Sequence, residues 1–229
     1  MNKQIINVML TIILVLSVAG CATQKVSRCT SPGDNPQNHY VAGMEALEQF
    51  KFDTAQAKFE RALYCDDTFS PAYGGLAIIY ADKTSKQKDF DYESVERKRT
   101  LEYVEKCGKT INSPEDRLAF YLAVIRANTF MDGKNWLSKT EDAYNRAKRV
   151  AVNERMLLYY NGIESVDYFM GLAYIRAQYF EKARDMFSHV LDAKKSSKWN
   201  GYADAAWKRN DKIARAVSGI SLGDIGKRI

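Results

Sequence analysis

The segment DTAQAKFERALYCDD, residues 53–67, contains the spacing that decides how this chain folds. Ala55, Phe59 and Ala62 are four and then three positions apart, so they share one face of a helix. That face is small at both ends and aromatic in the middle, so we expect the ring to insert between neighbouring helices as a knob enters a socket. The segment is therefore predicted to be the second helix of a packed helical pair.

The same spacing recurs in QYFEKARDMFSHVLD, where Ala183, Phe187 and Val190 take the corresponding positions. A weaker copy lacks the aromatic ring and consists of Ala143, Ala147 and Val150. Eleven residues after Ala62 comes a face formed by Tyr73, Leu76, Ala77 and Tyr80. The helices expected before the other two segments carry comparable faces, formed by Met170, Gly171 and Tyr174, and by Leu118, Tyr121, Leu122 and Ile125.

This arrangement resembles the tetratricopeptide repeat (TPR), in which an aromatic residue, a leucine, a small residue and a tyrosine precede a small–aromatic–small helix face. The resemblance implies an all-α fold, a TPR-like α-solenoid of antiparallel helical hairpins over residues 38–198. Two good repeats are expected near 38–68 and 164–192, with two degenerate hairpins between them.

Three features depart from the repeat pattern. Asp67 stands where the family usually has a proline, residues 81–94 form a long insertion, and residues 152–164 disturb the helical period. A set of unrelated amphipathic hairpins therefore remains the alternative interpretation.

Composition also favours helices over sheet. The 229 residues are 46% hydrophobic and 27% charged, as in ordinary globular proteins, and include only four prolines and thirteen glycines. Ala, Leu, Lys and Glu, which favour helices, are plentiful. We expect one folded unit that is all-α.

Capping chemistry predicts where five helices begin. Asn35-Pro36, Ser70-Pro71 and Ser113-Pro114 each place a side-chain acceptor before a proline, which is tolerated in the first helical turn. Asp53 with Gln56, and Ser138 with Glu141, have the spacing of capping boxes, in which the two residues satisfy each other's backbone donors.

The first twenty residues, MNKQIINVMLTIILVLSVAG, hold one lysine before an uncharged run that is shorter than the roughly 20 residues needed to cross a bilayer. Val18-Ala19-Gly20-Cys21 resembles the bacterial lipobox. The resemblance implies that a signal peptide, residues 1–20, is cleaved between Gly20 and Cys21, and that Cys21 carries acyl chains. A buried N-terminal helix is the alternative.

The lipobox also implies a compartment. A lipid-anchored protein of the bacterial cell envelope is expected, and Ala22 after the cysteine points to the outer membrane, facing the periplasm. Residues 21–37 are polar and show no periodicity, which predicts a lipidated flexible tether.

No catalytic, cofactor-binding or metal site is expected, so we predict that the protein is not an enzyme. The two histidines, His39 and His189, lie far apart, and the chain contains neither HExxH nor CxxC. Gly74-Gly75 is not followed by the Lys and Ser or Thr of a phosphate-binding loop.

Three cysteines remain after Cys21. Cys107 follows Val104 by three residues on the inward face of a predicted helix, so we expect it to be buried. Cys29 and Cys65 are the preferred disulfide, because the start of a hairpin's first helix lies beside the end of its second. Three free thiols are the alternative.

The net charge of +6 is explained by the C-terminal part, where residues 194–229 hold nine Lys or Arg against three Asp. Residues 199–229 are predicted to form a capping helix and a basic tail. A solvated helix face is the plain explanation of this charge, and anionic lipid or an acidic protein surface are alternatives. Nucleic acid is not expected as a partner, because the lipobox implies a location outside the cytoplasm.

In tetratricopeptide arrays the inner faces of the first helices form a groove that holds a partner peptide or helix. The resemblance implies a groove lined by Tyr40, Met44, Leu47, Ile78, Arg126, Tyr168, Leu172 and Arg176. It favours a lipid-anchored envelope adaptor or scaffold with an unknown protein partner.

Two alternatives stay open at this stage. One is a pilotin-like or outer-membrane assembly lipoprotein that serves one client. The other is a solute-handling accessory protein or enzyme with a pocket between helices. The sequence does not define the oligomeric state.

Overall fold

The computed structural model describes residues 28–29, 31–85, 94–131, 133–150, 162–192 and 198–218. Within these ranges the chain is all-helical and contains no strand, which confirms the all-α part of the predicted fold class. The helices are α2 (Pro36–Glu48), α3 (Phe52–Cys65), α4 (Ser70–Ser85), α5 (Val95–Lys109), α6 (Pro114–Met131), α7 (Trp136–Ala147), α9 (Gly162–Arg176), α10 (Phe180–Asp192) and α11 (Lys198–Ser218). No helix in the described ranges is both long and apolar enough to cross a bilayer.

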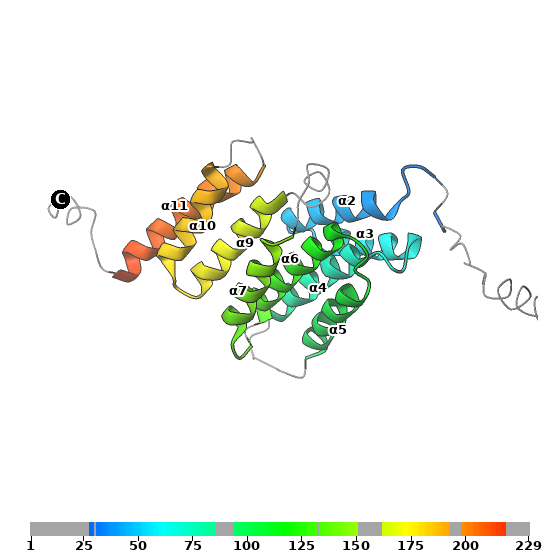
Figure 1. The fold of residues 1–229 in the computed structure, drawn as a ribbon, viewed down its shortest axis with the longest axis horizontal. Helices are drawn as coiled ribbons and strands as arrows, with labels where there is room; N and C mark the ends of the chain where they lie inside the picture. Colours follow the sequence, from blue (N-terminus) through cyan, green and yellow to red (C-terminus); the bar gives the residue numbers. More distant parts are fainter. Residues whose placement is uncertain are drawn as a thin grey trace, which may run out of the picture.

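The helices follow one another along the long axis of the molecule, from α2 and α3 at one end to α10 and α11 at the other (Figure 1). Each helix packs on the next helix of the described chain. Alternate helices also contact one another, so that α2, α4, α6, α9 and α11 form one continuous layer. The others, α3, α5, α7 and α10, pack onto that layer. Among the described residues of these four helices, Lys182 of α10 pairs with Glu141 of α7 at 3.4 Å.

The ring of Phe59 is fully buried between α2 and α4. A Cβ atom added to Gly43 of α2, or to Gly75 of α4, would lie 2.5 Å from a ring carbon of Phe59. Because carbon atoms do not approach so closely without a shift of the ring or a helix, the ring fits only beside glycine. The aromatic knob predicted from the sequence is present, and its socket contains these two glycines.

The hairpin α9–α10 repeats the local structure of α2–α3. A Cβ on Gly171 would lie 2.5 Å from the ring of Phe187, as one on Gly43 would from Phe59. The turns are also alike, because Phe50 and Gln178 have positive φ values of 58° and 62°. In each turn the next residue donates its N–H, at 2.9 Å, to the carbonyl five residues before it. The two hairpins therefore share one geometry at a constant offset in the sequence.

Two of the predicted helix caps are confirmed. The side chain of Asn35 accepts a hydrogen bond from the backbone N–H of Asn38 at 2.8 Å, and α2 begins at the following proline. The hydroxyl of Ser113 accepts from the N–H of Asp116 at 3.0 Å, just before α6.

Two of the other predicted caps are wrong, whereas the helix start predicted at Ser70 is confirmed, because α4 begins there. Helix α3 begins at Phe52, before Asp53, because the positive φ of the turn brings the chain into helix early, and Gln56 bonds to Glu60 instead. Ser138 lies inside α7, whose N-cap is Asn135 in the left-handed conformation. The Ser70 hydroxyl is used elsewhere: it donates to the carbonyl of Cys107 at 2.8 Å and so ties α4 to α5.

The Phe59 socket predicts the effect of adding a single methyl group. We expect Gly43→Ala to lower the free energy of unfolding by about 1–3 kcal/mol, because the ring has no room to move away. Gly201→Ala is the matched control, since Gly201 lies in α11 with no atom within 4 Å of an added Cβ. That change should be neutral or stabilising by up to about 1 kcal/mol.

Urea denaturation followed by circular dichroism measures both changes. Adding Phe59→Leu to Gly43→Ala should recover part of the lost stability, because the smaller side chain leaves space for the methyl group. Equal stability of the two alanine variants would show that the Phe59 socket has room for the added methyl group.

Candidate functional site

Four of the expected groove residues are core residues in the structure. Tyr40, Met44, Leu47 and Ile78 have between 2% and 4% of their surface exposed. They hold α2 and α4 in the molecule and offer no surface to a partner, contrary to the groove-facing position expected for them.

Arg126 is the expected groove residue with the most unusual surroundings. It lies on α6, is only 7% exposed, and its guanidinium carbon is 4.2 Å from the centre of the Phe169 ring on α9. Its Nε and Nη1 atoms are buried and have no hydrogen-bond partner among the described residues. A buried charged donor without a partner is costly, so this side chain requires an explanation beyond packing.

The electrostatic surroundings of Arg126 are mixed. Burial lowers the pKa of the Arg126 guanidinium to about 10, and the charges of Glu48 and Asp82 partly oppose that shift. The side chains of Tyr40 and Tyr168 act on the same group. Residues from α2, α4 and α9 thus surround one cation on α6, although they are far apart in the sequence.

Aromatic side chains surround Tyr168, which is half-buried on α9. The centre of its ring lies 5.1 Å from that of Phe169, 6.0 Å from Phe187, 5.3 Å from Trp199 and 6.1 Å from Tyr202. Burial raises the pKa of the Tyr168 phenol. Trp199 is 2% exposed and attaches α11 to this cluster, so α11 does pack as an additional helix at the end of the row.

The last two expected groove residues lie further along α9. Leu172 is half-buried and packs against the core. Arg176 is exposed, yet its Nη1 donates to the carbonyl of Thr129 on α6 and its guanidinium carbon lies 5.8 Å from the Trp136 ring centre. Arg176 therefore links α9 to α6 and α7 in this structure.

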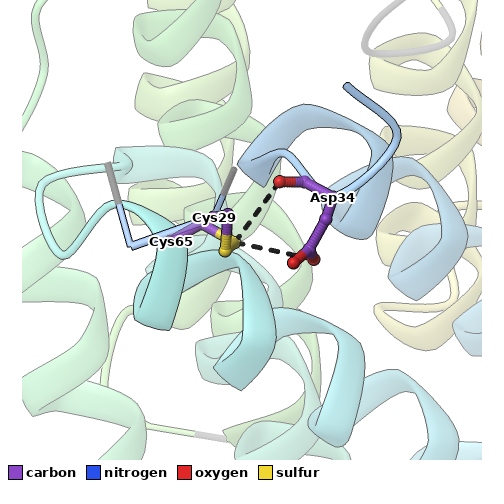
Figure 2. A group of neighbouring side chains, drawn as sticks. All are labelled: Cys29, Asp34 and Cys65. Carbon is purple, nitrogen blue, oxygen red and sulfur yellow. Dashed lines mark hydrogen bonds between the residues drawn. A yellow bond between two sulfur atoms is a disulfide. The ribbon is translucent and has the colours of Figure 1, made fainter. Parts of the chain in front are cut away.

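A disulfide joins Cys29 to Cys65, the last residue of α3, with an Sγ–Sγ distance of 1.99 Å. This is the pair that the sequence analysis preferred. Asp34 lies against it, with a backbone and a side-chain oxygen each 3.9 Å from the Cys65 sulfur (Figure 2). Because a disulfide sulfur carries no proton, these are contacts without a hydrogen bond.

Asp34 is also the centre of an ion-pair network. Its Oδ1 accepts from His39 Nε2 at 2.6 Å and from Arg61 Nε at 3.1 Å, and its Oδ2 pairs with Arg61 Nη2. The guanidinium of Arg61 first, and His39 second, lower the pKa of the Asp34 carboxyl from 3.8 to about 2. We call Cys29, Asp34, His39, Arg61 and Cys65 the disulfide corner.

Asp34 lies in the segment predicted to be a flexible tether, and its role was not predicted from the sequence. No local pattern could reveal it, since Arg61 is 27 residues away and its approach depends on how α2 and α3 pack. The predicted tether is consequently shorter than residues 21–37, because residues 28–29 and 31–35 are placed beside α3 and α2.

Ligand atoms of Cys29, Asp34 and Cys65 lie within 4.8 Å of one another, a spacing that metal ligands can have. The thiolate is the form of cysteine that binds metals, and here the two sulfur atoms are bonded to each other. With the disulfide formed, the corner links the chain before α2 to the end of α3 by one covalent bond and by ion pairs.

The remaining described thiol, Cys107, is buried, and burial raises its pKa to about 12, so it is expected to be unreactive.

A surface cleft of about 510 Å³ lies between α5, α6 and α7. Its apolar wall includes Val104, Phe120 and Val124, and its rim includes Lys139 and Arg146. The volume is in the range of small-ligand pockets. A pocket between helices was one of the open alternatives, but the sequence did not locate this cleft, because it arises from the separation of α5 and α7 over α6.

The predicted cleavage and lipidation site, Gly20 and Cys21, lies outside the described residues, as do residues 219–229 of the basic tail.

Comparison of the chain with protein-family models, with curated proteins and with solved structures finds no match. The function must therefore be argued from the residues themselves.

The ion pairs of Asp34 predict a pH dependence of stability. Because the folded pKa of about 2 is below the ordinary value of 3.8, the carboxylate stabilises the fold above about pH 4, and this contribution disappears as the pH falls through 2. Asp34→Asn should lower the melting temperature at neutral pH, and its melting curve should converge with that of the wild type near pH 2.

Melting followed by circular dichroism at a series of pH values tests this expectation. Asp185→Asn, at an exposed position of α10, is the control and should change stability by less than about 0.5 kcal/mol. A constant difference between wild type and Asp34→Asn at every pH would show that the ionised carboxylate is not the source of the effect.

Proposed function

We propose that this protein is a lipid-anchored adaptor of the bacterial envelope, which binds an acidic group of a protein partner at Arg126. The anchor is supported by the resemblance of Val18-Ala19-Gly20-Cys21 to a lipobox. The binding role is supported by one observation above all, the buried guanidinium whose Nε and Nη1 have no hydrogen-bond partner in the part of the chain that the structure describes. The protein has no catalytic role in this proposal.

The arrangement of helices supports a TPR-like solenoid as the scaffold of the adaptor. The hairpins α2–α3 and α9–α10 repeat the same turn and the same contact between a glycine and an aromatic ring. The continuous layer of α2, α4, α6, α9 and α11 is what the first helices of successive repeats would form. Arg126 and Tyr168 both lie on helices of this layer.

The chemistry of the partner follows from the guanidinium. A partner carboxylate that enters beside Phe169 would accept hydrogen bonds that the protein leaves unmade, and charge-assisted bonds of this kind are strong. Glu48 and Asp82 act on Arg126 electrostatically, and their negative charges would disfavour a partner group that carries more than one negative charge. A single carboxylate of the partner is therefore the expected group. Tyr202, which is 41% exposed beside Tyr168, supplies an aromatic contact at the edge of this region.

A residue that is retained for binding although it destabilises the fold can be recognised by substitution, because its replacement raises the stability and weakens the binding. Replacing Arg126 with methionine removes a buried, unpaired charge and keeps a long side chain. We expect Arg126→Met to raise the free energy of unfolding by about 1–3 kcal/mol while it weakens capture of the partner at least tenfold. Arg117→Met, at an exposed arginine of the same helix, should change neither quantity.

Denaturation of the purified domain measures the stability, and crosslinking in detergent-solubilised membranes measures retention of the envelope partner. A loss of stability in Arg126→Met would assign Arg126 to the core and overturn the binding role. If a small solute stabilises wild type and Arg126→Met equally, the cleft between α5, α6 and α7 becomes the functional site instead.

The anchor makes its own prediction. Cys21→Ser should leave a precursor that still contains residues 1–20 and carries no acyl chain, because the sulfur of Cys21 is the predicted attachment point. Mass spectrometry of the membrane-extracted protein gives both results directly. Normal cleavage in this variant would refute the lipobox interpretation.

A further inference from the structure

We propose that the disulfide corner faces the bilayer, and that lipid headgroups are what Arg28, Arg61 and Tyr64 contact. This inference rests on the proposed acylation of Cys21 and goes beyond it, because an anchor alone does not define which face of a protein meets the membrane.

The disulfide determines how far the folded part can move from the lipid. Cys29 is only eight residues after Cys21 and is bonded to the end of α3. Eight residues span at most about 29 Å even when fully extended. The Cα atoms of Cys29 and Cys65 are 5.2 Å apart, so the end of α3 is held within about 34 Å of the acylated residue, close to the length of a 21-residue helix such as α11.

Without the disulfide the attachment would be looser. The next point where the chain is held is Asp34, through its pairs with Arg61 and His39, five residues further on. The limit would then increase to about 45 Å. The disulfide thus shortens the tether between Cys21 and the folded part, and it also stabilises the hairpin formed by α2 and α3.

The surface beside the disulfide suits a membrane interface. Tyr64 is 50% exposed at the end of α3, and the guanidinium carbons of Arg61 and Arg28 lie 4.9 and 5.8 Å from its ring centre. Tyrosine is enriched at the level of lipid headgroups, and arginine binds phosphate well.

Net charge does not drive this contact. Asp34 already pairs with Arg61 and His39, and Asp66 accepts hydrogen bonds from the backbone and hydroxyl of Thr68. The disulfide corner therefore carries no large net positive charge, and its orientation toward the membrane depends on the short tether between Cys21 and Cys29. We accordingly expect little change in orientation between low and physiological salt, unlike a surface bound by charge alone.

This orientation directs the rest of the molecule away from the lipid. Helices α10 and α11 lie at the opposite end of the row from α2 and α3 (Figure 1). The aromatic cluster around Tyr168, which lies against α11, is then on the membrane-distal half and accessible to a partner in the aqueous compartment.

Energy transfer to labelled lipid tests the orientation. Full-length, acylated protein is reconstituted into vesicles of three parts phosphatidylethanolamine to one part phosphatidylglycerol that contain a headgroup-linked acceptor. A fluorescent non-natural amino acid replaces either Tyr64 or Tyr179, which are 50% and 51% exposed and so form a matched pair. Transfer should be at least twofold more efficient from position 64, and should stay so when the salt concentration is changed.

Two variants test the role of the tether. Cys29→Ser combined with Cys65→Ser, and separately an insertion of eight Gly and Ser residues between Cys21 and Arg28, should each reduce transfer from position 64. The insertion leaves the disulfide intact, so a folding defect in the double serine variant cannot obscure the result.

The outcomes separate this inference from the proposed function. Equal transfer from both positions, or stronger transfer from position 179, in a protein whose mass includes the acyl chains overturns the orientation while the anchor stands. A mass without acyl chains refutes the anchor and, with it, this inference.

Discussion

The fit of the Phe59 ring between two glycines is the constraint on which the rest of the structure depends. With Gly43 on one side and Gly75 on the other, the ring determines how closely α2 and α4 lie on α3. Phe187 and Gly171 impose the same geometry on α9 and α10. Since alternate helices form the continuous layer, these contacts define its spacing and thereby position Arg126 and Tyr168 on it.

The sequence predicted the helices and the aromatic knobs because both depend on local spacing. It did not predict that Gly43 and Gly75 form the socket, since only tertiary packing shows which small residues face the ring. The same limit applies to the expected groove, where helical spacing identified a face shared by Tyr40 and Met44 but not the depth at which neighbouring helices bury it. The disulfide corner was predicted only in its cysteines, because Asp34 acts through a distant arginine.

Asp167, the other buried charged residue among those described, shows that unmet hydrogen-bond donors like those of Arg126 are not a general property of the buried charges. Asp167 is 4% exposed on α9, and its carboxylate accepts hydrogen bonds from Tyr144 at 2.8 Å and from Lys148 at 3.0 Å. Helix α7 and the residue after it thus supply hydrogen bonds to the buried charge of α9. Around Arg126 the neighbouring helices supply an aromatic ring and carboxylates that act electrostatically, and no described residue bonds its Nε or Nη1. These donors are the ones that the proposed partner group would use.

The disulfide and the buried arginine belong to one arrangement if the protein works at a membrane. An adaptor on a long flexible tether presents its binding region in all directions, so a partner must find it by diffusion and by chance orientation. If Cys21 is acylated as proposed, a tether of eight residues before the disulfide to α3 would restrict the rotation of the whole row of helices. Because that restriction would exist before a partner arrives, its entropy would not be lost again on binding, and a modest set of contacts at Arg126 would be enough to hold the proposed client.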